Sequence, residues 1–171
     1  MMTLDSFEAI VRTLNQFNVS YLVAGGLAVN AHGYLRMTRD VDLVIALKPD
    51  NILQAFEALG TLEYRPLVPI TAGQFADPEM RSQWIKEKGM KVLNFFSDQY
   101  KDTPIDIFVF EPFNYEKEIP VCMRTELLPG ITVQFVSLPT LIHMKEMANR
   151  PRDVDDLQHL RWILEEQNHD K

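Results

Sequence analysis

The sequence predicts an α/β (α+β) fold, in which a mixed β-sheet is flanked by helices and followed by C-terminal helices. Three observations support this prediction. Short apolar segments rich in β-branched and aromatic residues recur along the chain, segments with helical spacing of apolar residues lie between them, and glycine or proline separates many of them. The expected strands are residues 21–24, 40–45, 91–96, 104–110 and 131–136.

The expected helices begin near residues 5, 27, 50, 78, 138 and 153. Asp5, with Glu8 three residues later, predicts the N-cap of the first helix. Val154, Leu157, Leu160 and Leu164 are expected to form the buried side of the last helix.

Two segments give weaker signals. Residues 64–76 contain Pro66, Pro69 and Gly73, and we expect a loop with a short turn there. Residues 116–124 are ambiguous, with an edge strand expected after Pro120.

Length and composition indicate one ordinary globular domain over residues 1–171, with a core of about 1–136 and a helical part of about 137–171. The net charge of −7 argues against binding along a long nucleic acid, because such binding needs many phosphate contacts. The sequence contains neither an apolar run of membrane-spanning length nor a signal peptide pattern, so we expect a cytoplasmic protein. Cys122 is the single cysteine, which makes a structural zinc site improbable.

The first candidate site lies where the strand at residues 21–24 ends. Gly25 and Gly26 have no Cβ, so backbone N–H groups there can approach a bound group closely. A helix expected from Leu27 would add the positive end of its dipole, which favours phosphate. A pair of glycines alone is more often a plain turn.

The second candidate site is the strand that begins with Asp40 and Asp42. Residues two apart on a strand point to the same face, roughly 7 Å apart along the chain. Two carboxylates on one face repel each other unless a cation lies between them. The alternative is that both acids are solvated at an exposed strand end.

A third acid, Asp106, interrupts the apolar strand at residues 104–110. A carboxylate between two isoleucines is seldom buried without a partner. If this strand pairs with the strand of Asp40 and Asp42, the three carboxylates form one cluster. Clustered carboxylate oxygens suit Mg²⁺ or Mn²⁺.

These motifs together resemble the nucleotidyltransferase superfamily of the polymerase β type. The resemblance rests on Gly25-Gly26, on the pattern Arg36-x-Thr38-x-Asp40-x-Asp42, and on Asp106 within an apolar strand. The chain is most similar to the small bacterial proteins related to the toxin of type IV toxin–antitoxin systems and to the minimal nucleotidyltransferases. It also resembles the antibiotic-modifying nucleotidyltransferases.

The resemblance implies a metal-dependent enzyme that transfers a nucleoside monophosphate from a nucleoside triphosphate (NTP) to a hydroxyl acceptor. Asp40, Asp42 and Asp106 would be the catalytic and metal-binding residues, and Gly25 and Gly26 would hold the triphosphate.

Basic residues complete the set of nucleotide-binding candidates. By resemblance, Lys145 would reach the triphosphate. Arg36 and Arg39 lie close to the acids in the sequence, where they would either contact phosphates or neutralise the carboxylates; of the two, Arg39 is counted as a nucleotide-binding candidate. Asp153 is expected either at the site or as a favourable charge at a helix N-terminus. Asp156 is expected to pair with Arg150 or Lys145.

The sequence leaves the acceptor open among an RNA end, a protein side chain and a small antibiotic-like molecule. A rival hypothesis is an inactive module that binds a nucleotide or a protein partner such as a cognate antitoxin. A third is that the acids are only surface charges.

Overall fold

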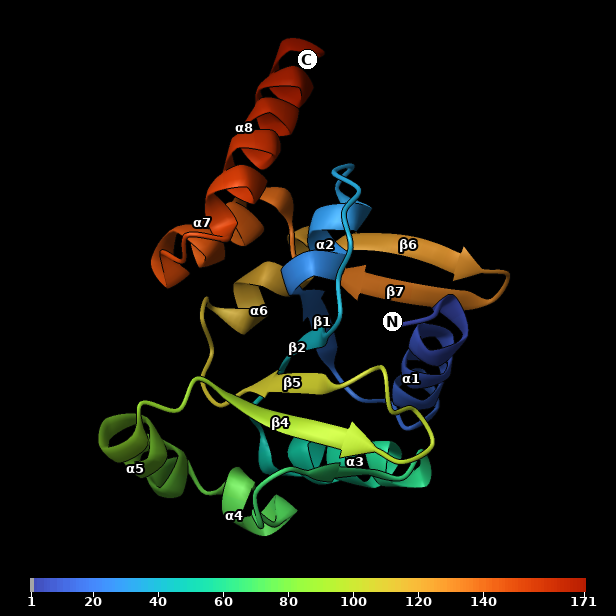
Figure 1. Cartoon of the computed structure of the whole chain (residues 1–171), viewed down its shortest axis with the longest axis vertical. Coiled ribbons are helices and arrows are strands. Elements are labelled where there is room, and N and C mark those ends of the chain that lie inside the picture. Colours follow the sequence, from blue (N-terminus) through green and yellow to red (C-terminus); the bar gives the residue numbers. More distant parts are fainter. Residues whose placement is uncertain (1) are drawn as a thin grey trace.

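The computed structural model describes residues 2–171, which form a seven-stranded mixed sheet flanked by helices (Figure 1). The strand order is β3-β4-β5-β2-β1-β7-β6. The strands are β1 (Tyr21–Ala24), β2 (Val41–Ile45), β3 (Tyr64–Pro66), β4 (Val92–Ser97), β5 (Ile105–Phe108), β6 (Met123–Leu128) and β7 (Ile131–Phe135). Two pairs, β2 with β5 and β1 with β7, are parallel, and the other neighbours are antiparallel. This architecture confirms the predicted fold class.

Helices cover the sheet and extend beyond it. They are α1 (Leu4–Gln16), α2 (Gly25–Ala31), α3 (Pro49–Thr61), α4 (Ala72–Ala76), α5 (Pro78–Lys88), α6 (Tyr115–Glu118), the 3₁₀ helix η1 (Ile119–Val121), α7 (Leu138–Ala148) and α8 (Asp153–His169). Helix α1 packs against α3 and β7, while α7 packs against α8 and contacts α2. In Figure 1, α8 projects away from the sheet and carries the C-terminus at its far end. None of the helices in residues 2–171 combines the length and the hydropathy that a membrane crossing requires.

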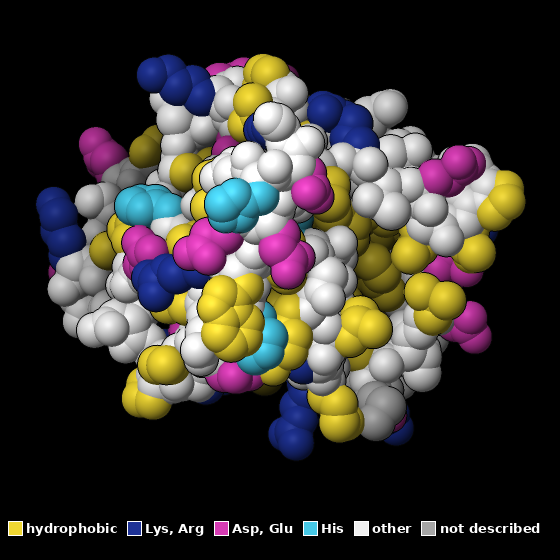
Figure 2. Space-filling view, turned by 90° about the horizontal axis from the view of Figure 1, so that it is seen from above, with side chains coloured by type: hydrophobic (Ala, Val, Ile, Leu, Met, Phe, Trp, Pro, Cys, Tyr) yellow, Lys and Arg dark blue, Asp and Glu magenta, His cyan; other side chains and the backbone are white. Residues whose placement is uncertain are grey.

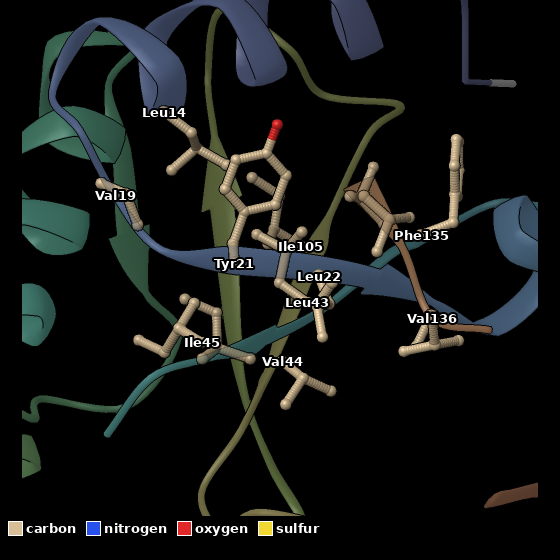
Figure 3. Close-up of a cluster of buried hydrophobic side chains, with 14 of the residues drawn as sticks. Leu14, Val19, Tyr21, Leu22, Leu43, Val44, Ile45, Ile105, Phe135 and Val136 are labelled. Carbon is tan, nitrogen blue, oxygen red and sulfur yellow. The ribbon is translucent and has the colours of Figure 1, made fainter. Parts of the chain in front are cut away.

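The core lies around the central strands β1, β2 and β5 (Figure 3). Tyr21, Leu22, Leu43, Ile45 and Ile105 are each at most 1% exposed. Burying a large apolar side chain of this kind stabilises the fold by about 1.5–3 kcal/mol. The same burial fixes the register of the strands, because a shift by one residue would turn the apolar side chains to the wrong face.

The structure corrects the expected start of the first helix. Thr3, not Asp5, is the N-cap, and its hydroxyl accepts a hydrogen bond from the backbone N–H of Ser6. The Ser6 hydroxyl also accepts a hydrogen bond from the backbone N–H of Thr3, so this pair forms a reciprocal capping box in which serine takes the place of the expected acidic residue.

Residues 64–76 are more ordered than predicted, because they contain β3 and α4. Tyr64 is buried and donates a hydrogen bond to the carbonyl oxygen of Thr103, which ties the edge strand β3 to the segment that leads into β5. Thr71 caps α4 by accepting a hydrogen bond from the backbone N–H of Gln74. The ambiguous segment forms α6 and η1, and the strand expected after Pro120 is the edge strand β6.

The predicted buried side of the last helix is wrong at one position. Val154 is 65% exposed, whereas Leu160 is fully buried and Leu157 and Leu164 are partly buried. The buried residues near the start of α8 are instead Asp153 and Asp156.

The face seen from above in Figure 2 carries acidic side chains gathered beside histidines.

Candidate active site

The structure brings the three predicted acids together at one edge of the central strands. Strands β2 and β5 are parallel neighbours, and Asp42 lies directly opposite Asp106 in their register. Asp40 precedes β2, because the strand begins at Val41, one residue later than expected. The expected pairing of the two acid-bearing strands is therefore confirmed, while the roles of the acids stay predictions.

A cavity of about 700 Å³ opens over these acids and contains most of the other candidates. Asp40, Asp42 and Asp106 line it, together with Gly25 and Gly26. Apolar side chains of β5 and α7 form another part of its wall. Its basic lining residues are Arg36, Arg39, Lys91, Lys145, Arg150 and Arg152. A volume of this size lies within the range of sites for small molecules and cofactors.

Position 25 requires a glycine for two reasons: the backbone conformation there, and the lack of space for a side chain. Its φ of +62° lies in the left-handed region that favours glycine. A Cβ built at this position would stand 1.9 Å from Oδ2 of Asp42. Helix α2 begins at Gly25, two residues earlier than expected, so the glycines form its first turn and do not precede it. The absent side chain leaves the Asp42 carboxylate in contact with the backbone of this turn.

The carboxylates are electrostatically strained. Burial raises the pKa of Asp42 to about 6, and repulsion from Asp106 and Asp40 adds to this effect. Burial also raises the pKa of Asp106, with a further contribution from Asp40. The positive charges of Lys145 and Arg150 lower the pKa of Asp42, but this decrease is smaller than the increase. A cation at this place would relieve the repulsion.

Asn94 is a site residue that the sequence analysis missed. It lies opposite Asp106 in the antiparallel pairing of β4 and β5, and its side-chain amide donates a hydrogen bond to Oδ1 of Asp106. This bond opposes the rise in the pKa of Asp106. The available signal was a polar residue within the apolar run of residues 92–96. If the strands expected at residues 91–96 and 104–110 pair, such a residue faces a neighbour on the other strand.

Lys145 lines the cavity but is only 4% exposed, and its ammonium already has two partners. Its Nζ lies 2.8 Å from Asp153 and 2.7 Å from Asp156. Asp156 also accepts two hydrogen bonds of 2.7 Å from Arg36, and Arg150 contacts Asp153 at 2.7 Å. Of the two expected partners of Asp156, the structure therefore has Lys145, and it adds Arg36.

This ion network explains why the two aspartates tolerate burial. Burial alone would raise the pKa of both Asp153 and Asp156. Hydrogen bonds and charges from Lys145, Arg36 and Arg150 outweigh it, so both pKa values are lowered. Both acids remain ionised at neutral pH, which keeps α7 and α8 joined to each other and to the segment that precedes β2.

Arg39 and Arg152 differ from the paired cations of this network. Both are exposed and line the cavity, and neither has an ion pair or side-chain hydrogen bond among residues 2–171. They therefore remain available to an anionic ligand.

The acids fit a divalent cation by their chemistry. Within residues 2–171, no three acidic, histidine or cysteine side chains are already arranged as a complete metal site. Asp40, Asp42 and Asp106 nevertheless supply hard oxygen donors from two adjoining segments, and their mutual repulsion is what a cation offsets. The register of β2 and β5 holds Asp42 and Asp106 beside each other.

Comparison with known proteins gives a family match and several similar folds. Residues 9–161 match the family model described as "Nucleotidyl transferase AbiEii toxin, Type IV TA system". No curated protein sequence matches the chain.

Solved structures with 12–16% sequence identity share the fold. The lincosamide antibiotic adenylyltransferase LnuA, solved with lincomycin, is 14% identical with a TM-score of 0.61, over 95% of this chain and 98% of that one. ANT(2")-Ia in complex with adenylyl-2"-tobramycin is 12% identical with a TM-score of 0.56, over 94% and 88%. An antigenic nucleotidyltransferase-like protein from Paracoccidioides brasiliensis is 16% identical with a TM-score of 0.55, over 93% and 73%.

Proposed function

We propose that this chain, which belongs to the AbiEii nucleotidyltransferase family, transfers a nucleoside monophosphate from an NTP to a hydroxyl acceptor. The observation that carries the proposal is the placement of Asp42 opposite Asp106 on adjacent strands, beside Gly25 and within one cavity. A charge cluster of this kind destabilises a fold, so a ligand that neutralises it is the simplest reason for its presence.

Asp40, Asp42 and Asp106 would hold Mg²⁺ or Mn²⁺. When bound, such ions would align the attacking hydroxyl with the leaving pyrophosphate and stabilise the charge that develops between them. The protein would contribute the rigid placement of its carboxylates, since β2 and β5 are fixed by the buried core.

The nucleotide would bind with its phosphates against the first turn of α2. Gly25 and Gly26 expose backbone there without an intervening side chain, and Arg39 faces the same cavity with its charge available. Two of the three N–H donors of the Lys145 ammonium are matched by the ion pairs with Asp153 and Asp156, and the residue is only 4% exposed, so little of its ammonium is open to a phosphate. We therefore assign it first to positioning and second to phosphate binding.

Asp106 would accept the proton of the acceptor hydroxyl. The hydroxyl oxygen then bonds to the α-phosphorus, the bond from that phosphorus to the bridging oxygen of the β-phosphate breaks, and pyrophosphate leaves with those electrons. Asn94 would hold one carboxylate oxygen of Asp106 and leave the other free for this transfer.

The family description names a toxin of a type IV toxin–antitoxin system, which supports a cognate antitoxin as partner. An RNA end or a protein would be the acceptor, and the cytoplasm the location. A second candidate is a small hydroxylated antibiotic as acceptor. The observation in its favour is the fold shared with LnuA over 98% of that chain, and LnuA was solved with lincomycin.

The test is pyrophosphate release from each NTP with Mg²⁺ or Mn²⁺, in the presence of RNA, lincosamide, aminoglycoside or protein acceptors. We expect release with at least one acceptor, and its loss in Asp40→Asn. Binding of an NTP without pyrophosphate release under any condition would instead support the inactive binding module.

A further inference from the structure

Thr38 occupies the place that a side chain at position 26 would take. A Cβ built on Gly26 would stand 2.5 Å from Oγ1 and 2.8 Å from Cβ of Thr38. Gly26 is not among the residues with positive φ, so its backbone would accept other residues. Position 26 is therefore glycine because Thr38 fills the space, and the hydroxyl of Thr38 lies against the first turn of α2.

The Thr38 hydroxyl is also free to donate. Thr38 lines the cavity with Gly25, Gly26 and Asp42 and is half-buried. Within residues 2–171, its one hydrogen bond goes to the carbonyl oxygen of Asp40 at 3.5 Å, a distance at which little bonding energy remains. A hydroxyl in this setting can turn its proton toward a ligand at small cost.

Hydrogen bonds of Arg36 hold the segment that leads to Thr38. The backbone N–H of Arg36 donates to the side chain of Asn30 at 3.0 Å, and its guanidinium holds Asp156 with two bonds and the carbonyl oxygen of Met37 with a third. The segment leading to Thr38 is thereby tied to α2 on one side and α8 on the other. Because this segment is already held in place, binding a ligand beside it costs less conformational entropy than ordering a free loop would.

We propose that Thr38 is a phosphate-binding residue, whose hydroxyl donates a hydrogen bond to a non-bridging oxygen of the nucleotide triphosphate. This inference rests on the proposed function, since it places the triphosphate between the first turn of α2 and the acids. The hydroxyl adds a neutral donor next to the backbone of Gly25 and Gly26, where a second side chain has no room. It is close to the carboxylates without adding to their negative charge.

Calorimetric binding to the full chain tests the proposal, with GTP, ATP, inorganic pyrophosphate and an unphosphorylated nucleoside as probes in Mg²⁺. Thr38→Val keeps the shape and removes the hydroxyl, so the triphosphates and pyrophosphate should bind roughly tenfold or more weakly, as expected for a lost hydrogen bond to a charged group. Thr38→Ser should recover most of that loss. Thr125→Val, on the exposed strand β6, is the matched control and should bind like the wild type.

An exchange of the two side chains provides a second, independent test. Gly26→Ser alone should bind phosphate poorly, because the new Cβ meets Thr38. The double variant Gly26→Ser with Thr38→Gly should regain affinity, since it restores one hydroxyl to the same space. Thr38→Ala would not be a suitable second substitution, because the alanine Cβ at position 38 would still lie 2.8 Å from the serine Cβ at position 26. Thermal melts confirm that each variant is folded.

The outcomes separate this inference from the proposed function. If the wild type binds neither triphosphates nor pyrophosphate, both are overturned. If the wild type binds them and Thr38→Val binds equally well, the role of Thr38 is refuted and the proposed function stands. Weaker binding of the unphosphorylated nucleoside to Thr38→Val, by the same factor, would also refute a phosphate contact.

Discussion

Asp42→Asn should make the protein more stable while it abolishes nucleotidyl transfer. In the folded chain, burial and then repulsion from Asp106 and Asp40 raise the pKa of Asp42 from 3.8 to about 6. The unfolded chain has no such environment, so its Asp42 titrates near the ordinary value. A difference of this size between the two states corresponds to about 3 kcal/mol of destabilisation at pH 7.

The pH dependence gives the prediction its sign. Below about pH 3.8 Asp42 is protonated in both states and contributes nothing. As the pH rises from 3.8 to about 6, the unfolded state loses its proton before the folded state does, so the folded state is progressively destabilised. Above pH 6 the cost is complete. Asparagine carries no charge, so the stability advantage of Asp42→Asn should be close to zero near pH 3.5 and about 3 kcal/mol at pH 7.

Urea unfolding from pH 3.5 to 8, without divalent metal, measures this difference. Added Mg²⁺ should raise the unfolding midpoint of the wild type more than that of the variant, because only the wild type keeps all three carboxylates. Asp170→Asn, at the exposed C-terminal end, is a control that should stay within about 0.5 kcal/mol of the wild type at every pH. A variant that is less stable than the wild type at pH 7, or equally stable at all pH values, would show that Asp42 is not strained.

Three further substitutions test the surroundings of the acids. Gly25→Ala should abolish transfer and lower the thermal midpoint, because its Cβ would stand 1.9 Å from a carboxylate oxygen at a φ of +62°; an active variant would contradict the close packing. Asp156→Asn should cost about 3–5 kcal/mol in urea unfolding, since it breaks the buried pair with Lys145, and a loss below about 1 kcal/mol would mean that the network is solvated. Asn94→Ala should leave stability within about 0.5 kcal/mol, because the side chain is exposed. It should lower kcat about tenfold with little change in KM for the nucleotide, since one hydrogen bond orients Asp106; a change in KM alone would place Asn94 in nucleotide binding.

Much of this site could be predicted from the sequence because its main parts depend on local patterns. Apolar, β-branched and aromatic residues along residues 40–45 and 104–110 predict strands that carry Asp42 and Asp106, and a charge in an apolar strand marks the latter. Gly25 was recognisable because adjacent glycines at a strand end are followed by the acid-bearing strand, although the glycines alone indicate only a turn. These signals need no knowledge of distant contacts.

The parts that were missed depend on contacts across the fold. Thr38 belongs to the sequence motif, but its place beside Gly26 is visible only in the fold, and Asn94 matters only because its strand pairs in a particular register. The burial of Lys145 also depends on α8, which presents two aspartates to it. Helical spacing suggested Val154 for the buried side, but that pattern cannot foresee that ion pairs will take the place of apolar packing.

The C-terminal helices are therefore part of the site and not an addition to it. The expected division near residue 136 separates the strands that carry Asp42 and Asp106 from α7, which carries Lys145, and from the α7–α8 connection, which carries Arg150, yet all four residues line the same cavity. Lys145 and Arg150 lower the pKa of Asp42 from the helical side, so the charge state of the acids depends on the docking of α7 and α8. Since Asp156 binds both Lys145 and Arg36, loosening these helices would release the segment before β2 at the same time. The same ion pairs therefore influence both where the acids lie and how readily they ionise.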